Sequence, residues 1–218
     1  DEEPTENPNA SKPRYIWIDA AANFPDFANS KENIARDLAL AKDAGFTDIV
    51  VDVRPTTGDV LFKTNLVDQV KFMYAWIGSN YTKVERTATW DYLQAFVDEA
   101  RKQGLRIHAA INTFVGGNQI DGGTGLLYRD QSKAEWATQM NMQVGITSVM
   151  NTSESTKFFN PAHPEVQTFL CDLLKDLAGY DLDGIFLDRG RFLNLQADFS
   201  EESRKQFEEY MGGIRIQN

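Results

Sequence analysis

Residues 180–188 read Tyr-Asp-Leu-Asp-Gly-Ile-Phe-Leu-Asp. This stretch is the most informative one for the fold, because it is a predicted strand whose apolar run ends in a carboxylate. It follows a predicted amphipathic helix over residues 164–178 and a glycine at position 179. The same order of helix, glycine, apolar strand and polar tip occurs over residues 30–54 and 90–112. Such alternation is typical of a parallel sheet covered by helices. Ligands bind such sheets at the carboxyl ends of the strands, so we look for a site there.

Four strands are predicted, at Tyr15–Asp19, Ile49–Arg54, Ile107–Asn112 and Ile185–Asp188. A closed TIM-type barrel needs eight strands and about 250 residues. We therefore expect an α/β fold, a TIM-type (β/α) barrel that is present as its N-terminal half or in truncated form. Half a barrel exposes an open sheet edge and an apolar face. We expect a partner chain such as a second copy in a homodimer, a rearrangement, or further sequence to cover them.

Helices are predicted between these strands and after the last one. They are Ser30–Ala44, with Ser30 as N-cap and Gly45 beyond its end, Trp90–Gln103, Pro164–Ala178 and Ser200–Met211. The last should lead into a short strand at Ile214–Gln217. On the first helix Ile34, Leu38 and Ala41 lie at helical spacing and should cover the sheet.

Two long excursions, Thr56–Thr89 and Phe114–Phe159, follow the carboxyl ends of the second and third strands. Loops of this length are usually functional or contain small elements of their own. Thr147–Met150 and Thr156–Phe159 are predicted to pair as a hairpin. Three aromatic residues in the excursions either stack on sugar rings or form a small core: Trp76, Trp136 and Tyr128.

The composition excludes some classes of partner. A net charge of −10 over 218 residues disfavours nucleic acid and anionic lipid, whereas neutral ligands such as sugars are unaffected. The single cysteine, Cys171, allows no intrachain disulfide and is predicted to be buried. No transmembrane run or signal peptide is present.

The chain divides into a tail and one large domain. Residues 1–13 are acidic, rich in Asn and Pro, and predicted to be a disordered polar tether. A tether of this kind follows lipoprotein cleavage sites, and a cloning boundary explains it equally well. Residues 14–218 form the predicted, incomplete barrel domain.

Polar side chains gather where the predicted strands end. Side chains alternate along a strand, so the face on which each candidate lies can be predicted. If these faces all point into a barrel, the candidate side chains converge: Asp19, Asp52, Arg54, His108, Asn112 and Asp188. A carboxylate at a strand tip can attack the anomeric carbon of a sugar or stabilise its developing positive charge. A neighbouring arginine keeps a carboxylate ionised, and Asn and His donate hydrogen bonds to hydroxyl groups.

Each candidate also has a structural explanation. Asp188 can form a surface ion pair with Arg189, Asp52 can pair internally with Arg54, and His108 can be a core histidine. Two further ligand contacts are expected after the last strand and before the third helix: Arg191 and Asn160. Asn160 lies in a segment that also fits a simple helix-entry loop.

Other motifs point away from cofactors and metals. The Gly-rich stretch 116–125 has neither a Walker lysine nor a G-x-G-x-x-G frame before a helix, so phosphate binding is rejected. Two histidines and one cysteine lie far apart, and no D-x-D-x-D-G calcium loop occurs. No cofactor and no metal site is predicted.

Five ordered blocks are spread over residues 14–192: 14–19, 49–58, 104–112, 160–166 and 180–188. They resemble the glycosyl hydrolase-like family 10, whose members are secreted, often lipid-anchored bacterial barrel proteins. The last block also looks like the fourth-strand nucleophile motif of the wider α-glycosidase barrel superfamily. The resemblance implies a (β/α)₈ barrel, carbohydrate as ligand and a secreted, cell-surface or periplasmic location, with a lipidated N-terminus outside this chain.

The resemblance also implies that Asp188 is the nucleophile and that Arg54, His108 and Asn112 line the pocket. Two features depart from the family: residues 189–191 read Arg-Gly-Arg where an acidic or aromatic residue is usual, and the later strand that would carry the general acid is missing. Two functions therefore stay open. One is hydrolysis of glycosidic bonds in oligo- or polysaccharides. The other is carbohydrate binding or surface assembly without catalysis, and a deacetylase or other metal hydrolase is a more distant third.

Overall fold

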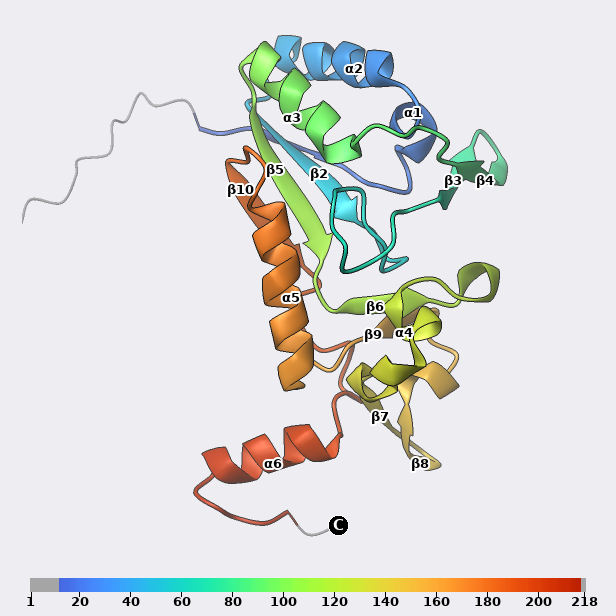
Figure 1. Ribbon diagram of the computed structural model, residues 1–218, viewed down its shortest axis with the longest axis vertical. Helices are drawn as coiled ribbons and strands as arrows, with labels where there is room; N and C mark the ends of the chain where they lie inside the picture. The colour runs from blue at the N-terminus through green and yellow to red at the C-terminus, as the bar shows by residue number, and fades with distance from the viewer. Residues whose placement is uncertain (1–11, 217–218) are drawn as a thin grey trace, which may run out of the picture.

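A parallel four-stranded sheet lies at the centre of the computed structural model, which describes residues 12–216 (Figure 1). Its strands run in the order β1 (Tyr15–Ile18), β2 (Asp48–Arg54), β5 (Arg106–Asn112) and β10 (Gly184–Asp188). All three pairings are parallel. The four predicted strands are thus confirmed, whereas the predicted tether lies, except for residues 12 and 13, outside the described residues.

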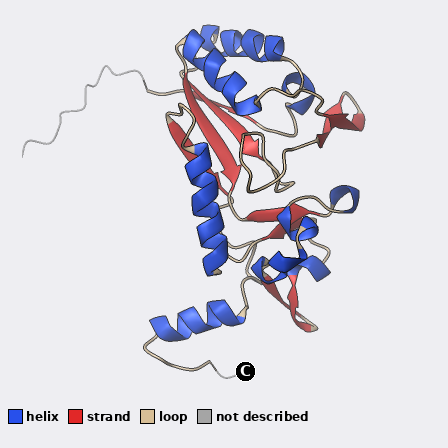
Figure 2. Ribbon diagram, viewed as in Figure 1, coloured by secondary structure: helices blue, strands red, loops and turns tan. Residues whose placement is uncertain are grey.

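Three of the four helices that connect these strands begin and end close to the predicted residues, and the short first one was not predicted. They are α1 (Phe24–Phe27), α2 (Lys31–Asp43), α3 (Tyr92–Gln103) and α5 (Pro164–Leu177) (Figure 2). The hydroxyl of Ser30 accepts a hydrogen bond from Asn33 N at 3.1 Å, which caps α2 as expected. Helix α3 ends at Gly104 with a φ of +69°, a conformation that glycine adopts without steric cost.

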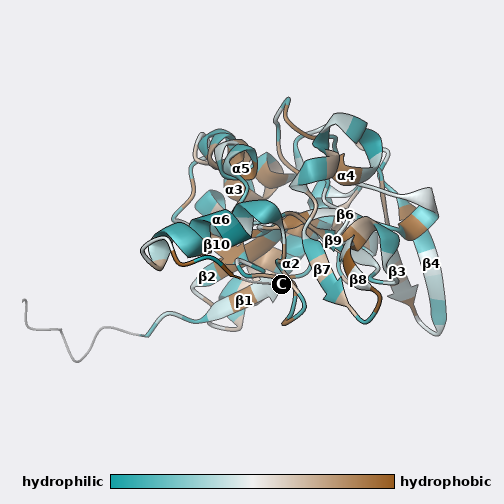
Figure 3. Cartoon of the chain, turned by 90° about the horizontal axis from the view of Figure 1, so that it is seen from below, coloured by the Kyte–Doolittle hydropathy of each residue, from teal (hydrophilic) through white to brown (hydrophobic). Residues whose placement is uncertain are grey.

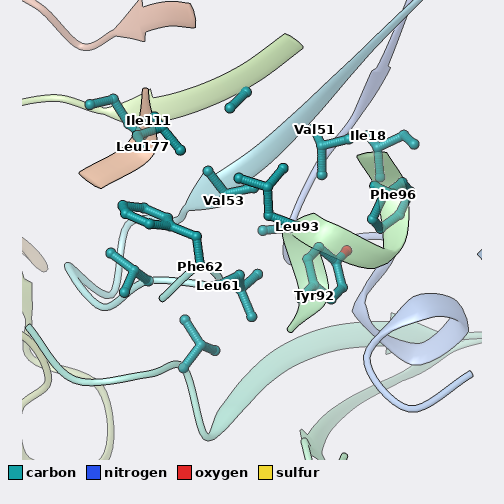
Figure 4. Close-up of a cluster of buried hydrophobic side chains, with 14 of the residues drawn as sticks. Ile18, Val51, Val53, Leu61, Phe62, Tyr92, Leu93, Phe96, Ile111 and Leu177 are labelled. Carbon is teal, nitrogen blue, oxygen red and sulfur yellow. The ribbon is translucent and has the colours of Figure 1, made fainter. Parts of the chain in front are cut away.

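The hydrophobic core lies between the helices and one face of the sheet. Ile34, Leu38 and Ala41 of α2 are buried as predicted. Figure 4 shows Val51 beside Phe96 of α3. The other face of the sheet carries the alternate residues, including the polar ones at the strand ends.

The excursions contain three small antiparallel pairs. These are β3 (Phe72–Ile77) with β4 (Asn80–Glu85), β6 (Val115–Asn118) with β9 (Thr156–Phe158), and β7 (Gln139–Met142) with β8 (Gly145–Ser148). Short helical turns connect them: Ile120–Gly122, α4 (Leu126–Arg129), Gln131–Trp136 and Val149–Asn151.

The predicted hairpin between residues 147–150 and 156–159 is wrong. The Ser148 hydroxyl accepts a hydrogen bond from Met150 N and caps a helical turn, so the chain leaves β8 there. Lys157 then extends its amine to the carbonyls of Val149 and Thr152. Strand β9 consequently pairs with the distant β6 instead of its neighbour in sequence.

The final helix, α6 (Glu201–Tyr210), is mainly hydrophilic (Figure 3). The predicted strand after it is wrong for the described residues 214–216, and Gln217 lies outside them. After Gly212 the chain folds back on α6. Ile216 N donates to Glu208 Oε1 at 2.8 Å, and Arg204 Nη2 donates to Ile216 O at 2.9 Å. These side chains bind the backbone groups that a strand would use for pairing.

Among residues 12–216 the sheet has open edges at β1 and β10, as expected for part of a barrel. Apolar side chains remain exposed there, including Trp17 at 45% and Leu187 at 54% of full exposure. The prediction of a buried Cys171 is wrong, because α5 turns Leu170 and Leu173 to the core and leaves Cys171 exposed. No helix among the described residues is long and apolar enough to cross a membrane.

Shortening a core side chain of α3 should lower the free energy of unfolding strongly. Phe96 is fully buried, with ring centroids 5.4 Å from Phe27 and 5.0 Å from Tyr92. Phe96→Ala should cost about 3 to 5 kcal/mol in urea unfolding, because it leaves a cavity. Leu40→Ala, at a position 60% exposed on α2, is the control and should cost less than about 0.5 kcal/mol. Equal losses in both variants would contradict this core.

Candidate functional site

Four of the predicted site residues meet in one cavity at the carboxyl ends of the strands. Asp19 follows β1, Asp52 lies in β2, and Asn112 and Asp188 end β5 and β10. Parallel pairing places Asp188 directly opposite Asn112. Together they line a cavity of about 150 Å³ whose other walls include Trp17, Ala21, Pro55, Thr56, Met73 and Arg189.

Asp52 is the most buried carboxyl group of this cavity, with 7% of its surface exposed. Its Oδ1 accepts a hydrogen bond from Arg54 N at 3.2 Å, and its Oδ2 lies 3.5 Å from the amide nitrogen of Asn112. Burial, together with the negative charges of Asp19 and Asp188, raises the pKa of Asp52 to about 7. Near neutral pH this group is therefore protonated in a large fraction of molecules and can donate a hydrogen bond.

The other two carboxyl groups are held by neighbouring backbone. Asp19 Oδ1 accepts hydrogen bonds from Ala21 N at 2.9 Å and Ala22 N at 2.7 Å. Asp188 Oδ1 accepts one from Arg189 N at 2.7 Å, and Arg189 adopts a φ of +49°. Within residues 12–216 the second oxygen of each carboxyl group, Oδ2, receives no hydrogen bond. These two atoms are free to accept hydrogen bonds from a ligand.

Arg54 does not line this cavity, which corrects the prediction that it stands beside Asp188. The pairing of β2 with β5 shifts register between Asp52 and Arg54, so simple alternation fails there. The side chain is fully buried, and its guanidinium donates to the carbonyls of Asn112, Thr113 and Val115. Burial lowers the pKa of Arg54 to about 10, which leaves it charged at neutral pH.

His108 also lies outside the cavity and takes the structural role. It sits near the start of β5, opposite Gly184, with Nε2 2.8 Å from Asp48 Oδ1. Asp48 is fully buried and also binds Arg106 at 2.6 Å. The Arg106 guanidinium holds the pKa of Asp48 well below its usual range, against the opposing effect of burial. Sequence reasoning missed Asp48, although its spacing of four from Asp52 placed it on the same face.

The remaining two predicted ligand contacts are also elsewhere. Asn160 is buried, donates to Ser200 Oγ at 2.8 Å and accepts from Ala162 N at 2.9 Å, so it organises the entry to α5. Arg191 is exposed and donates to the carbonyls of Phe192 and Leu193. Neither lines the cavity of Asp188.

The three aromatic residues singled out in the excursions divide between the two explanations. Trp136 is buried against Phe159 and Phe169, with ring centroids 5.8 and 5.5 Å away, and belongs to a small core. Tyr128 covers the backbone of the Gly-rich stretch. Trp76 is 68% exposed on β3 and keeps a free face.

The cavity offers carboxyl and amide groups. Among residues 12–216, no three His, Cys, Asp or Glu side chains are arranged to hold a metal ion. Carboxyl and amide groups are hydrogen-bond partners for hydroxyl groups, and their position at strand ends is that of active sites in barrels.

The fold and this position define part of a TIM-type barrel with an acidic site. The chain belongs to the family described as glycosyl hydrolase-like 10, which matches residues 12–213. It is 31% identical to the "S-layer-related protein" of Niallia circulans over 96% of its own length and 13% of that protein. The chain thus spans about an eighth of this relative.

Two solved structures share the fold. One is alpha-L-fucosidase isoenzyme 2 from Paenibacillus thiaminolyticus, with a TM-score of 0.58 and 19% identity over 91% of this chain and 26% of that one. The other is a hypothetical protein from Ruminiclostridium thermocellum ATCC 27405, with a TM-score of 0.54 and 14% identity over 91% and 89%. The predicted family and the predicted partial barrel are confirmed.

Removing the buried guanidinium should destabilise the protein. Arg54→Met leaves three main-chain carbonyls without their donor, and the free energy of unfolding should fall by about 3 kcal/mol or more. Arg36→Met is the matched control, because Arg36 is mostly exposed and, within the described part of the chain, pairs with Asp37 and Asn33 alone. Its loss should stay below about 1 kcal/mol. Urea unfolding of both variants measures the difference, and similar losses would refute the role of Arg54.

The raised pKa of Asp52 should make its contribution to stability depend on pH. The folded pKa of about 7 exceeds the unfolded value, so the folded state binds more protons between about pH 4 and 7, and stability falls as pH rises through this window. Asp52→Asn removes this loss. The free energy of unfolding of the variant, relative to that of the wild type, should therefore rise by at most about 4 kcal/mol between pH 4.5 and 8. A stability difference that does not change with pH would contradict the burial of an ionisable group here.

Proposed function

We propose that this chain is the carbohydrate-binding part of a glycoside hydrolase-like protein that cleaves glycosidic bonds in oligo- or polysaccharides, with Asp188 as the nucleophile. The observation that carries the proposal is the cavity in which Asp19, Asp52, Asn112 and Asp188 meet at the strand ends. Membership of the glycosyl hydrolase-like 10 family supports it.

The chemistry of the cavity suits a sugar ring. Asp188 lines the cavity, and its Oδ2, which receives no hydrogen bond within residues 12–216, can approach the anomeric carbon or face the positive charge that develops on it. Asp19 accepts hydrogen bonds from ring hydroxyl groups, while protonated Asp52 can donate one. Asn112 is oriented by its hydrogen bond to the carbonyl of Arg54. The proton for the leaving oxygen is expected from a later strand of the barrel, outside this chain.

A second candidate function is carbohydrate binding or surface assembly without catalysis. The description of a relative as an S-layer-related protein favours it. Both candidates are consistent with a secreted, cell-surface or periplasmic protein, attached through a lipidated N-terminus outside this chain. A homodimer is one arrangement that would cover the open edges of β1 and β10.

The decisive variant is Asp188→Asn, which removes the nucleophilic charge and keeps the shape. In the whole protein that contains this chain, turnover of the cleaved polysaccharide should fall by about a thousandfold, while sugar binding changes less than about threefold. Reducing-end release and calorimetry measure the two quantities on a panel of bacterial and plant cell-wall glycans.

Asp172→Asn on the exposed face of α5 is the matched control and should leave both quantities unchanged. Unchanged turnover in Asp188→Asn would refute the nucleophile. Wild-type binding without release of product would establish the second candidate instead.

A further inference from the structure

A second cavity of about 360 Å³ adjoins the acidic one, and the two share Ala21, Thr56 and Met73 in their walls. Ordinary small-molecule sites have volumes of roughly 300 Å³ or more. The acidic cavity alone, at about 150 Å³, is smaller than such a site, whereas the adjoining cavity reaches this size. The pair is therefore suited to a ligand that extends from one cavity into the other.

One wall of the second cavity is aromatic and comes from the β3–β4 hairpin. The hairpin places Tyr74 opposite Lys83 and Trp76 opposite Tyr81, so these side chains share one face. Tyr74 and Tyr81 stack with ring centroids 5.4 Å apart and an interplanar angle of 29°. Met73 and Ala75 point to the other face and are buried, which anchors the hairpin. Tyr81 remains 56% exposed although it is large and aromatic.

The facing wall is mainly polar and comes from the end of β6, the residues after it and the residue before β9. It consists of Asn118, Gln119, Ile120 and Ser155. Gln119 N donates to Ser155 O at 2.9 Å, which fixes the backbone, while the Gln119 side chain makes no hydrogen bond within residues 12–216. An aromatic wall opposite amide and hydroxyl groups matches a sugar ring, which presents C–H groups on its faces and hydroxyl groups at its rim.

A polar bridge holds the two walls together. Asp121, which follows the polar wall, accepts a hydrogen bond from the Tyr74 hydroxyl at 2.9 Å and pairs with Lys83 Nζ at 2.5 Å. Both partners come from the aromatic wall. The width between the walls is thereby set before a ligand arrives, and a preorganised site loses less entropy on binding.

We propose that this hairpin groove, formed by Phe72, Tyr74, Tyr81, Asn118, Gln119 and Ser155, binds a second sugar ring next to the one at Asp188. The inference rests on the proposed function, since it takes the ligand of the acidic cavity to be a sugar. It adds where the second ring lies and that the sugar chain runs from Asp188 toward the β3–β4 hairpin.

The test measures affinity against chain length. Calorimetry on this chain uses mono-, di- and trisaccharides of the common hexoses, deoxyhexoses and amino sugars. The wild type should bind its preferred di- or trisaccharide at least tenfold more tightly than the matching monosaccharide. Tyr81→Ala should abolish this advantage and leave affinity for the monosaccharide within twofold, because Tyr81 lies outside the acidic cavity.

Two further variants provide a control and a second test of the groove. Tyr210→Ala, at an 86% exposed position on α6, is the matched control and should keep the full advantage of the longer sugars. Gln119→Ala, on the opposite wall, should reduce that advantage at least threefold without touching the hairpin.

The outcomes separate this inference from the function on which it rests. Binding of monosaccharides without any gain from a second ring would overturn the groove and leave the acidic site standing. An equal effect of Tyr81→Ala on all chain lengths, or an equal effect of Tyr210→Ala, would also overturn the groove. If the wild type binds none of the sugars, both proposals fail.

Discussion

The buried guanidinium of Arg54 connects the sheet to the segment that follows β5. It donates to the carbonyls of Asn112, Thr113 and Val115, which are the last residue of β5, the turn after it and the start of β6. A buried cation is costly unless it is paired, so this path of the chain is strongly fixed. The Asn112 amide donates back to the Arg54 carbonyl at 2.9 Å. Arg54 therefore positions the start of β6 with its guanidinium and orients an amide of the acidic cavity with its carbonyl.

Parallel pairing has an electrostatic consequence at the strand ends. It brings Asp19, Asp52 and Asp188 to one cavity, where their negative charges oppose each other and burial raises the pKa of Asp52. Groups that serve only stability are seldom arranged in this way, and perturbed pKa values cluster at functional sites. Asp48, at the other end of β2, shows the contrast. Its charge is balanced by Arg106, its Oδ1 lies within hydrogen-bond distance of His108 Nε2, and its pKa is lowered.

Periodicity in the sequence predicted the sheet and its helices because their contacts are repeated and local. It also predicted that Asp19, Asp52, Asn112 and Asp188 meet, since alternation and parallel pairing suffice for that. It failed for Arg54, because a shift of register after Asp52 leaves no trace in the residue pattern. For His108, alternation predicted the correct face of the sheet but not the position of the residue along the strand. Four residues at about 3.3 Å each place it roughly 13 Å below Asn112 along the strand.

The excursions were recognised by their length, but their pairing could not be read from local pattern. Strand β6 pairs with β9, and 37 residues lie between the paired residues Asn118 and Thr156. The sequence around either strand therefore does not indicate its partner. The excursions nevertheless form part of the walls of both cavities. Residues of β1 and β10 line the acidic cavity, whereas residues of the β3–β4 hairpin and of the segment after β6 line the adjoining cavity. In the proposed binding mode, a ligand held at Asp188 meets the Tyr74–Tyr81 wall when it extends toward the excursions, and this wall orients the sugar chain.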